Sequence, residues 1–184
     1  MMRIFTLSST LILLLLSSCS TLERGESTGV PLVIDTSAGV QVYDLTMTYR
    51  DVEFAGILLM NSGMQERNRF VLTSHFGMTV FDLETTAKGY KKHYAIPAMN
   101  RKRVLYLLWS DFSILMRPDF FKNIKYSYRE DGKLKSLVRS GSITKTEMSF
   151  IEYVNDFPNT LEIDHPYLQL NIKLKKIENA DGVI

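Results

Sequence analysis

The side chains in this chain that could bind a metal ion or act as general acids and bases are few and scattered. The three histidines are His75, His93 and His165. Zinc sites need ligands at close spacing or on facing elements, whereas His75 and His93 fall on different predicted strands and His165 falls in an Asp-His-Pro turn. The spacing therefore predicts three partly exposed histidines and no metal site.

One pair of carboxylates has a spacing that catalysis could use. Asp82 and Glu84 stand at alternate positions and share one face of a predicted strand, and paired carboxylic acids can cleave glycosidic bonds. A solvated strand face explains the same spacing, and we adopt that interpretation. The chain contains no G-x-S-x-G nucleophile elbow and no phosphate-binding loop. The sequence predicts neither an enzyme nor a cofactor.

The only cysteine, Cys19, stands at the end of an apolar run. Arg3 precedes this run over residues 4–16 and two serines follow it, which is the order of a secretory signal. The residues Leu16-Ser17-Ser18-Cys19 resemble the lipobox of bacterial lipoproteins, in which the cysteine is lipidated and becomes the first residue of the mature chain. The resemblance implies a signal peptide over residues 1–18 and a lipid anchor on Cys19. The alternative is an ordinary cleaved signal with a chance cysteine.

The next segment, residues 19–40, shows no helical or strand period, and we interpret it as the lipidated cysteine and a flexible tether. Some surface-exported lipoproteins carry an acidic run after the cysteine, but Glu23 and Glu26 stand apart here. We therefore expect a lipid-anchored protein of the cell envelope, on the outer membrane and facing the periplasm. Lysine plus arginine number 22 against 20 for aspartate plus glutamate, so no basic excess indicates a nucleic-acid partner.

Residues 41–184 are predicted to form a single β domain that contains one helix. From Val42 onward, apolar and polar side chains alternate with the period of two that is typical of a half-buried strand. Turn signals such as Asp131-Gly132 separate the runs. The predicted strands number about nine and lie at 42–49, 52–60, two within 69–84, 91–99, 123–130, 133–140, 142–153 and 168–177.

The hydrophobic period changes to that of a helix over residues 100–116. Asn100 is the predicted N-cap and Pro118 the stop signal. We interpret the basic triplet at the helix start as solvated, with anionic lipid headgroups as the alternative counter-charge. The predicted polar face carries Arg101, Lys102, Arg103, Ser110, Asp111 and Ser113.

Together these elements predict a mainly β fold with a helical lid (α+β). A strongly curved antiparallel sheet, or unclosed β-barrel, accommodates strands joined by short turns, and the helix must bury its apolar stripe against that sheet. Nine methionines, ten phenylalanines and nine tyrosines supply abundant apolar surface, and methionine adapts to irregular apolar ligands. These side chains form either a plain core or an apolar cleft under the helix.

The segment 43–118 resembles the periplasmic lipoprotein carrier and receptor superfamily (LolA/LolB-like). The resemblance rests on the order of an apolar strand with Gly56, a turn, the strand "RFVLT", a Phe-Gly turn with Gly77 and another apolar strand. It implies an unclosed, apolar-lined barrel, a helical lid and an acyl chain or other lipid as guest, without cofactor or catalysis. The family receptor inserts lipoproteins with an apolar residue on a protruding loop, and loop 61–67 of this chain offers Met64.

We therefore expect a membrane-anchored protein that holds a lipid or lipoprotein acyl chain in an apolar cleft under a helical lid, for trafficking or outer-membrane insertion. Its partners are then acyl chains and the membrane that receives its N-terminal lipid. The alternative is a non-catalytic interaction subunit of an envelope complex, with a protein partner, a filled core and no ligand. The residues expected to line the cleft are Leu45, Met47, Tyr49, Phe54, Leu58, Phe70, Leu72, Phe81, Leu105, Trp109 and Phe112.

Overall fold

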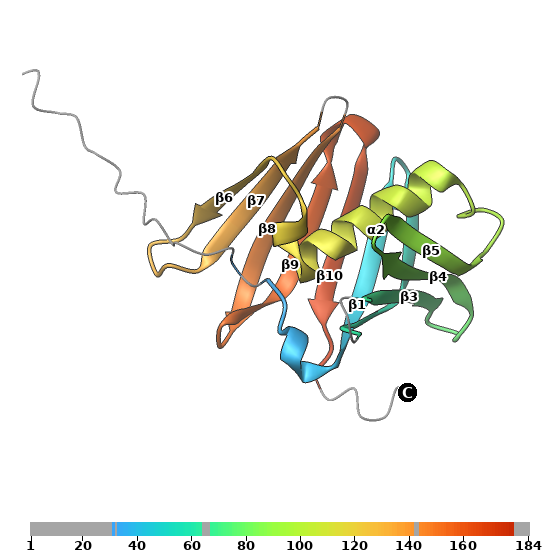
Figure 1. Cartoon of the computed structure of the whole chain (residues 1–184), viewed down its shortest axis with the longest axis horizontal. Helices are drawn as coiled ribbons and strands as arrows, with labels where there is room; N and C mark the ends of the chain where they lie inside the picture. Colours follow the sequence, from blue (N-terminus) through green and yellow to red (C-terminus); the bar gives the residue numbers. More distant parts are fainter. Residues whose placement is uncertain (1–30, 32, 64–66, 142–143, 179–184) are drawn as a thin grey trace, which may run out of the picture.

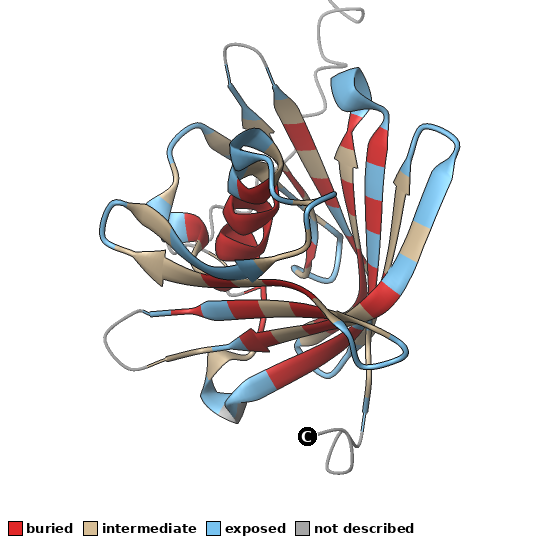
Figure 2. Ribbon diagram, turned by 90° about the vertical axis from the view of Figure 1, so that its right-hand side faces the viewer, coloured by how far each residue is buried: buried red, intermediate tan, exposed pale blue. Residues whose placement is uncertain are grey.

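The computed structural model describes residues 31, 33–63, 67–141 and 144–178 (Figure 1). Within them the chain forms one ten-stranded antiparallel sheet and one α-helix, α2. The sheet is unclosed and curls strongly around the helix (Figure 2), so the prediction of a mainly β fold on a curved, open sheet is confirmed. The predicted signal peptide, Cys19 and Met64 lie outside the described residues.

The elements follow one another in two groups of five strands with the helix between them. The first group is β1 (Val40–Tyr49), β2 (Val52–Asn61), β3 (Arg69–Ser74), β4 (Thr79–Thr86) and β5 (Gly89–Ala95). The helix is α2 (Lys102–Met116). The second group is β6 (Ile124–Tyr128), β7 (Leu134–Ser140), β8 (Lys145–Val154), β9 (Phe157–His165) and β10 (Leu170–Lys176). Three short 3-10 helices are η1 (Thr36–Ala38), η3 (Pro118–Phe120) and η4 (Pro166–Leu168).

Each group of strands is a meander in which sequence neighbours pair. The strand order is β5-β4-β3-β2-β1-β10-β9-β8-β7-β6. Pairing of β1 with β10, from Tyr43 opposite Lys176 to Tyr49 opposite Leu170, joins the two meanders at the centre of the sheet. The strands β5 and β6 form its two edges.

The period of two decides which side of each strand enters the core. In β10 the leucine and isoleucine at every second position are buried, and the residues between them are exposed or half-buried. The strand β1 contributes Tyr43 and Leu45 to the same core. Successive side chains of a strand point to opposite faces, so this alternation, readable in the sequence, turns one face of the curved sheet inward.

The helix α2 connects one edge of the sheet to the other and runs across the concave face (Figures 1 and 2). All of its residues from Leu108 to Met116 are buried. The ring of Phe112, 0% exposed, has its centroid 5.8 Å from that of Phe70 and 6.3 Å from that of Phe81. Burial of one such side chain contributes roughly 1.5–3 kcal/mol. Because so many of its side chains are buried, α2 is a part of the core that the sheet encloses.

The packed domain begins earlier in the chain than the sequence predicted. Val33 and Ile34 fall within the predicted tether 19–40, yet each is 2% exposed and belongs to the core. Asp35 then caps η1 by accepting a hydrogen bond of 2.9 Å from the Ser37 backbone N–H. Val33 and Ile34 end the short apolar run Val30-Pro31-Leu32-Val33-Ile34. Five residues are too few to show a period, so the periodicity does not reveal their burial.

The strand β9 is missing from the predicted elements because prolines stand at both of its ends. Pro158 is its second residue and lies opposite Tyr153 of β8. Proline is tolerated near the start of a strand, and beyond it Leu161 and Ile163 are buried at alternate positions. The predicted count of strands was therefore one too low.

The helix α2 begins without the predicted cap. Its N-cap is Arg101, which makes no side-chain cap hydrogen bond. Asn100, predicted for that role, instead accepts a hydrogen bond of 2.7 Å from Lys92 Nζ. The prediction of Asn100 as N-cap was wrong: the N-cap position falls one residue later, and the Asn100 side-chain oxygen is bonded to a lysine of β5.

Candidate functional site

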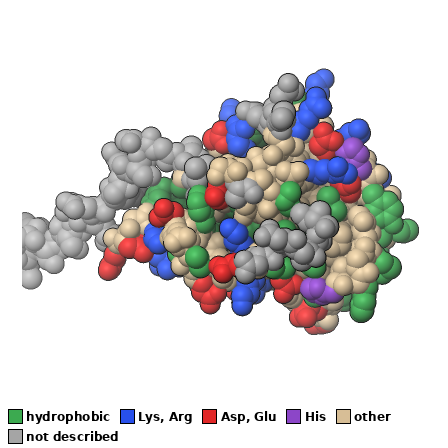
Figure 3. Space-filling model, turned by 90° about the horizontal axis from the view of Figure 1, so that it is seen from below, with side chains coloured by type: hydrophobic (Ala, Val, Ile, Leu, Met, Phe, Trp, Pro, Cys, Tyr) green, Lys and Arg blue, Asp and Glu red, His purple; other side chains and the backbone are tan. Residues whose placement is uncertain are grey.

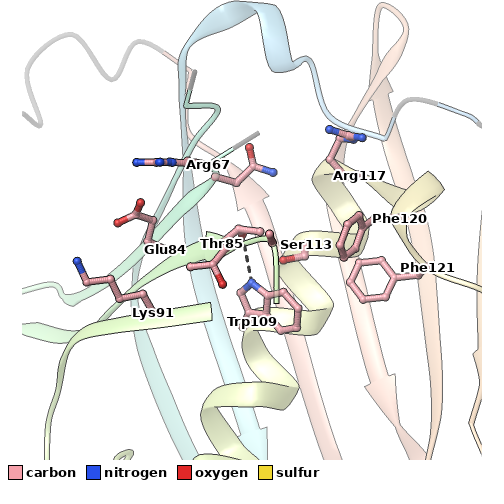
Figure 4. A pocket seen from close by; sticks show the side chains of 12 residues that line it. Arg67, Glu84, Thr85, Lys91, Trp109, Ser113, Arg117, Phe120 and Phe121 are labelled. Atoms are coloured by element: carbon pink, nitrogen blue, oxygen red, sulfur yellow. Dashed lines mark hydrogen bonds between the residues drawn. The ribbon is translucent and has the colours of Figure 1, made fainter. Parts of the chain in front are cut away.

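A cavity of about 500 Å³ opens beside α2 and next to β4 and β5 (Figure 4). Its volume falls within the roughly 300–1,000 Å³ that is common for ligand sites. Three aromatic side chains, Trp109, Phe120 and Phe121, form what we call the aromatic wall. Polar and charged side chains line the remainder, among them Arg67, Asn68, Glu84, Thr85, Lys91, Ser113 and Arg117.

Trp109 projects from α2 and is held in place by contacts on several sides. Its indole Nε1 donates a hydrogen bond of 3.1 Å to Thr85 Oγ1, which ties the helix to β4. Its ring centroid lies 5.8 Å from that of Tyr90 and 6.2 Å from that of Phe121. Trp109 is the only tryptophan of the chain, so tryptophan fluorescence reports on the surroundings of this one residue, which include the cavity.

Ser113 lies one helical turn beyond Trp109 and brings a hydroxyl group to the cavity. The residue is 3% exposed, and its Oγ has no hydrogen-bond partner among the described residues. Figure 4 shows this hydroxyl turned toward the cavity. A buried hydroxyl without a partner costs roughly 1–3 kcal/mol, so an oxygen-bearing occupant of the cavity would recover that free energy.

The charged side of the cavity is organised around Glu84. Its Oε2 lies 2.7 Å from His93 Nε2, and this hydrogen bond is the main cause that lowers the pKa of Glu84. The positive charges of Lys91 and Arg67 lower the same pKa further. Within the part of the chain that the structure describes, neither of these two cations forms an ion pair at contact distance. The described residues on this side of the cavity therefore carry more positive than negative charge.

A second hollow, of about 590 Å³, lies near the start of β4. Its lining includes Phe54, Met78 and Tyr94. The β3–β4 turn beside it carries Phe76, which is 92% exposed, and Gly77, whose φ of 78° allows the tight turn. Met78, close by in the sequence, is also largely exposed. Exposed apolar side chains that form a patch mark contact surfaces, so this turn is a second candidate for interaction.

The residues predicted to line a cleft under the helix lie in three different environments. Eight of them are buried. Five lie on strands of the sheet and three on α2 itself; they are Leu45, Leu58, Phe70, Leu72, Phe81, Leu105, Trp109 and Phe112. Met47 and Phe54 are half-buried against the same core, and Tyr49 is 46% exposed. Of these, Trp109 lines the cavity beside α2 and Phe54 lines the second hollow.

The sequence analysis missed a buried polar cluster between α2 and the sheet. His165 Nε2 lies 2.8 Å from Asp111 Oδ2, and both side chains are 1% exposed. Ser110 Oγ accepts a hydrogen bond of 2.6 Å from Arg139 Nη1 on β7. Ser110, Asp111 and Ser113 lie on the predicted polar face of the helix but are buried, because the sheet curls around the helix. The prediction that His165 is partly exposed was wrong, since its side chain is buried in the same cluster. An Asp in a helix and a distant His could have suggested the pair, but the sequence holds no spacing that identifies it.

The other two histidines are closer to the prediction. The side chain of His75 is 48% exposed and its Nε2 lies 3.5 Å from Asp44 Oδ1, and the side chain of His93 is 30% exposed. Among the described residues, no group of three His, Cys, Asp or Glu side chains is placed to hold a metal ion. No helix in the described ranges is long and apolar enough to cross a membrane.

Comparison with family models and with curated proteins identifies no relative of this chain. No protein-family model matches the chain, and a search of curated proteins finds no match. The candidate site is therefore defined by the aromatic wall, Ser113 and the charged side of the cavity.

Proposed function

We propose that this chain is a lipid-anchored protein of the bacterial envelope that binds a lipid or a lipoprotein acyl chain for trafficking or outer-membrane insertion. The observation that carries the proposal is the cavity of about 500 Å³ beside α2, with its aromatic wall. The concave face of the sheet is already filled by α2, so the guest lies beside the helix. The predicted lipid anchor at Cys19 supplies the location.

The energetics of such a site suit a carrier. Each CH₂ group removed from water contributes about 0.8 kcal/mol, so an apolar wall of three aromatic rings holds part of an acyl chain usefully. A bilayer buries the same chain equally well, so the guest can leave when the protein meets a membrane. Binding and release then differ by a small free energy, as transfer requires.

The exposed β3–β4 turn supports the same proposal. The resemblance to the lipoprotein carrier and receptor superfamily implies a protruding loop with an apolar residue at its tip. Phe76, 92% exposed, fits that description better than Met64, which lies outside the described residues. We therefore propose that Phe76 contacts the membrane or the apolar part of a transferred lipoprotein.

Two measurements on the purified full chain test the proposal. Native mass spectrometry is expected to show a co-purifying or exchangeable lipid. Titration with a fluorescent fatty-acid probe is expected to change the emission of Trp109 in a saturable manner, because the indole forms part of the aromatic wall. Absence of both signals would contradict lipid binding at this site.

A second candidate function is a non-catalytic interaction subunit of an envelope complex. The complete burial of α2 between Leu108 and Met116 favours it, because a filled concave face leaves no space beneath the helix. This candidate predicts no saturable change in Trp109 emission with any lipid. It also predicts that the protein co-purifies with another envelope protein under conditions that preserve complexes.

A further inference from the structure

The cavity beside α2 is lined by charged side chains that an uncharged apolar guest would not need. Arg67 and Lys91 line the cavity, and Glu84 lies close enough to both that their charges lower its pKa. The Glu84 carboxylate is already bonded to His93 at 2.7 Å. Among the described residues of this side, the two cations therefore outnumber the single carboxylate, which favours an anionic group there.

The third cation of the lining has a different status. Arg117 Nε and Nη2 each donate a hydrogen bond of 3.0 Å to the carboxylate of Asp119. This ion pair lies at the end of α2 that leads into η3. Arg117 therefore contributes little net charge to the cavity, and the anionic group is expected at Arg67 and Lys91.

The lining changes from charged to apolar along the cavity. In Figure 4 Arg67, Glu84 and Lys91 lie on one side, and Phe120 and Phe121 lie on the opposite side. Trp109 and Ser113 lie between them. A ligand that satisfies all three regions has a charged end, an oxygen near Ser113 and an apolar end, which is the description of an amphiphile.

We infer that the cavity binds an amphiphile with one acyl chain and an anionic headgroup, a carboxylate or a phosphate. The headgroup lies at Arg67 and Lys91, one of its oxygens accepts a hydrogen bond from Ser113 Oγ, and the chain lies along the aromatic wall. This inference rests on the proposed lipid binding and adds the chemical class of the headgroup.

The test is a titration of the delipidated full chain, followed through the emission of Trp109. The probes share one twelve-carbon chain and differ in the headgroup: dodecanoate, dodecyl phosphate, dodecanol and dodecyltrimethylammonium, each below its micelle concentration. We expect the two anionic probes to bind about tenfold more tightly than dodecanol, and their affinity to fall with added salt. The relative affinities of dodecanoate and dodecyl phosphate distinguish a fatty acid from a phosphate-bearing lipid.

Charge variants of opposite sign separate headgroup recognition from a general loss of folding. Arg67→Gln and Lys91→Gln are each expected to weaken dodecanoate binding about threefold, whereas Glu84→Gln is expected to strengthen it by a similar factor. None of the three should change the affinity for dodecanol. Lys175→Gln, at an exposed position of β10 that does not line the cavity, removes the same charge and serves as the matched control with no effect.

The outcomes distinguish this inference from the proposed function. Equal affinity for dodecanol and dodecanoate, unaffected by Arg67→Gln and Lys91→Gln, would overturn the headgroup assignment and leave lipid binding in place. Tighter binding of dodecyltrimethylammonium would overturn it as well. No saturable change with any probe would overturn the headgroup assignment, and the additional absence of a lipid in native mass spectrometry would overturn both proposals.

Discussion

The carboxylate of Asp111 is buried between α2 and β9. Its Oδ2 lies 2.8 Å from His165 Nε2, and its Oδ1 has no hydrogen-bond partner among the described residues. Burial raises the pKa of Asp111, while the hydrogen bond to His165 and the charge of Arg139 act in the opposite direction. Protonation of the Asp111 carboxyl therefore affects how stably α2 packs against β9.

Replacement of Asp111 by Asn should change the pH dependence of stability. The folded protein holds the Asp111 proton more tightly than the unfolded chain does, so the stability from this carboxyl is complete below its ordinary pKa of about 4 and is lost as the pH rises through the folded-state value. Wild type is therefore expected to lose stability relative to Asp111→Asn as the pH rises above about 4. Urea unfolding of both proteins across that range measures the difference.

Asp119 provides the control of opposite sign for this experiment. The hydrogen bonds from Arg117 lower the pKa of Asp119, so its contribution is present above the ordinary carboxyl pKa and is lost as the pH falls. Wild type should therefore gain stability relative to Asp119→Asn as the pH rises. The same sign for both substitutions would contradict the burial argument for Asp111.

At the scale of elements, α2 determines whether the protein has a movable lid or a fixed core helix. Its polar groups are bonded to three strands, through Thr85 on β4, Arg139 on β7 and His165 on β9. Its apolar groups fill the concave face. Both kinds of contact must break before the helix can leave the sheet, so we expect α2 to remain in place when a guest enters beside it.

The substitution Phe112→Ala tests this view of the helix. Phe112 is fully buried against Phe70 and Phe81, and truncation of such a side chain typically costs about 3–5 kcal/mol of unfolding free energy. Tyr106→Ala, on the exposed side of the same helix at 50% exposure, should cost much less. Chemical denaturation compares the two, and similar small losses for both would indicate a loosely held lid.

Much of the fold was predictable because its strands and its helix follow local patterns of apolar and polar residues. The alternation in β1 and β10 and the helical period over residues 100–116 mark these elements directly. The polar environment of α2 was not predictable, because Ser110 and Asp111 read as a solvated face unless the sheet is known to curl around the helix. Their partners, Arg139 and His165, are distant in sequence. Of the cavity lining, Trp109 was anticipated, whereas Ser113 and the charges on β4 and β5 depend on tertiary contacts.

At the scale of the whole molecule, the β3–β4 turn is a candidate point of contact with a membrane. Phe76 and Met78 are 92% and 67% exposed, and apolar side chains gain free energy when they enter the lipid interface. In a chain whose predicted anchor is removed by Cys19→Ala, we expect Phe76→Ser to reduce sedimentation with phospholipid vesicles several-fold without a change in unfolding free energy. Val154→Ser, also exposed and on β8, is the control, and equal effects of both would refute a specific role for the turn.

The pairing of β1 with β10 has a consequence for synthesis. Every other pair of neighbours in the described sheet joins consecutive strands, so each hairpin can assemble as soon as its second strand has been delivered. The strand β1 instead presents an open edge while most of the polypeptide is still being made. Unpaired edges can pair with strands of other chains, so we expect the growing chain to be most exposed to misassembly until its tenth strand has been made.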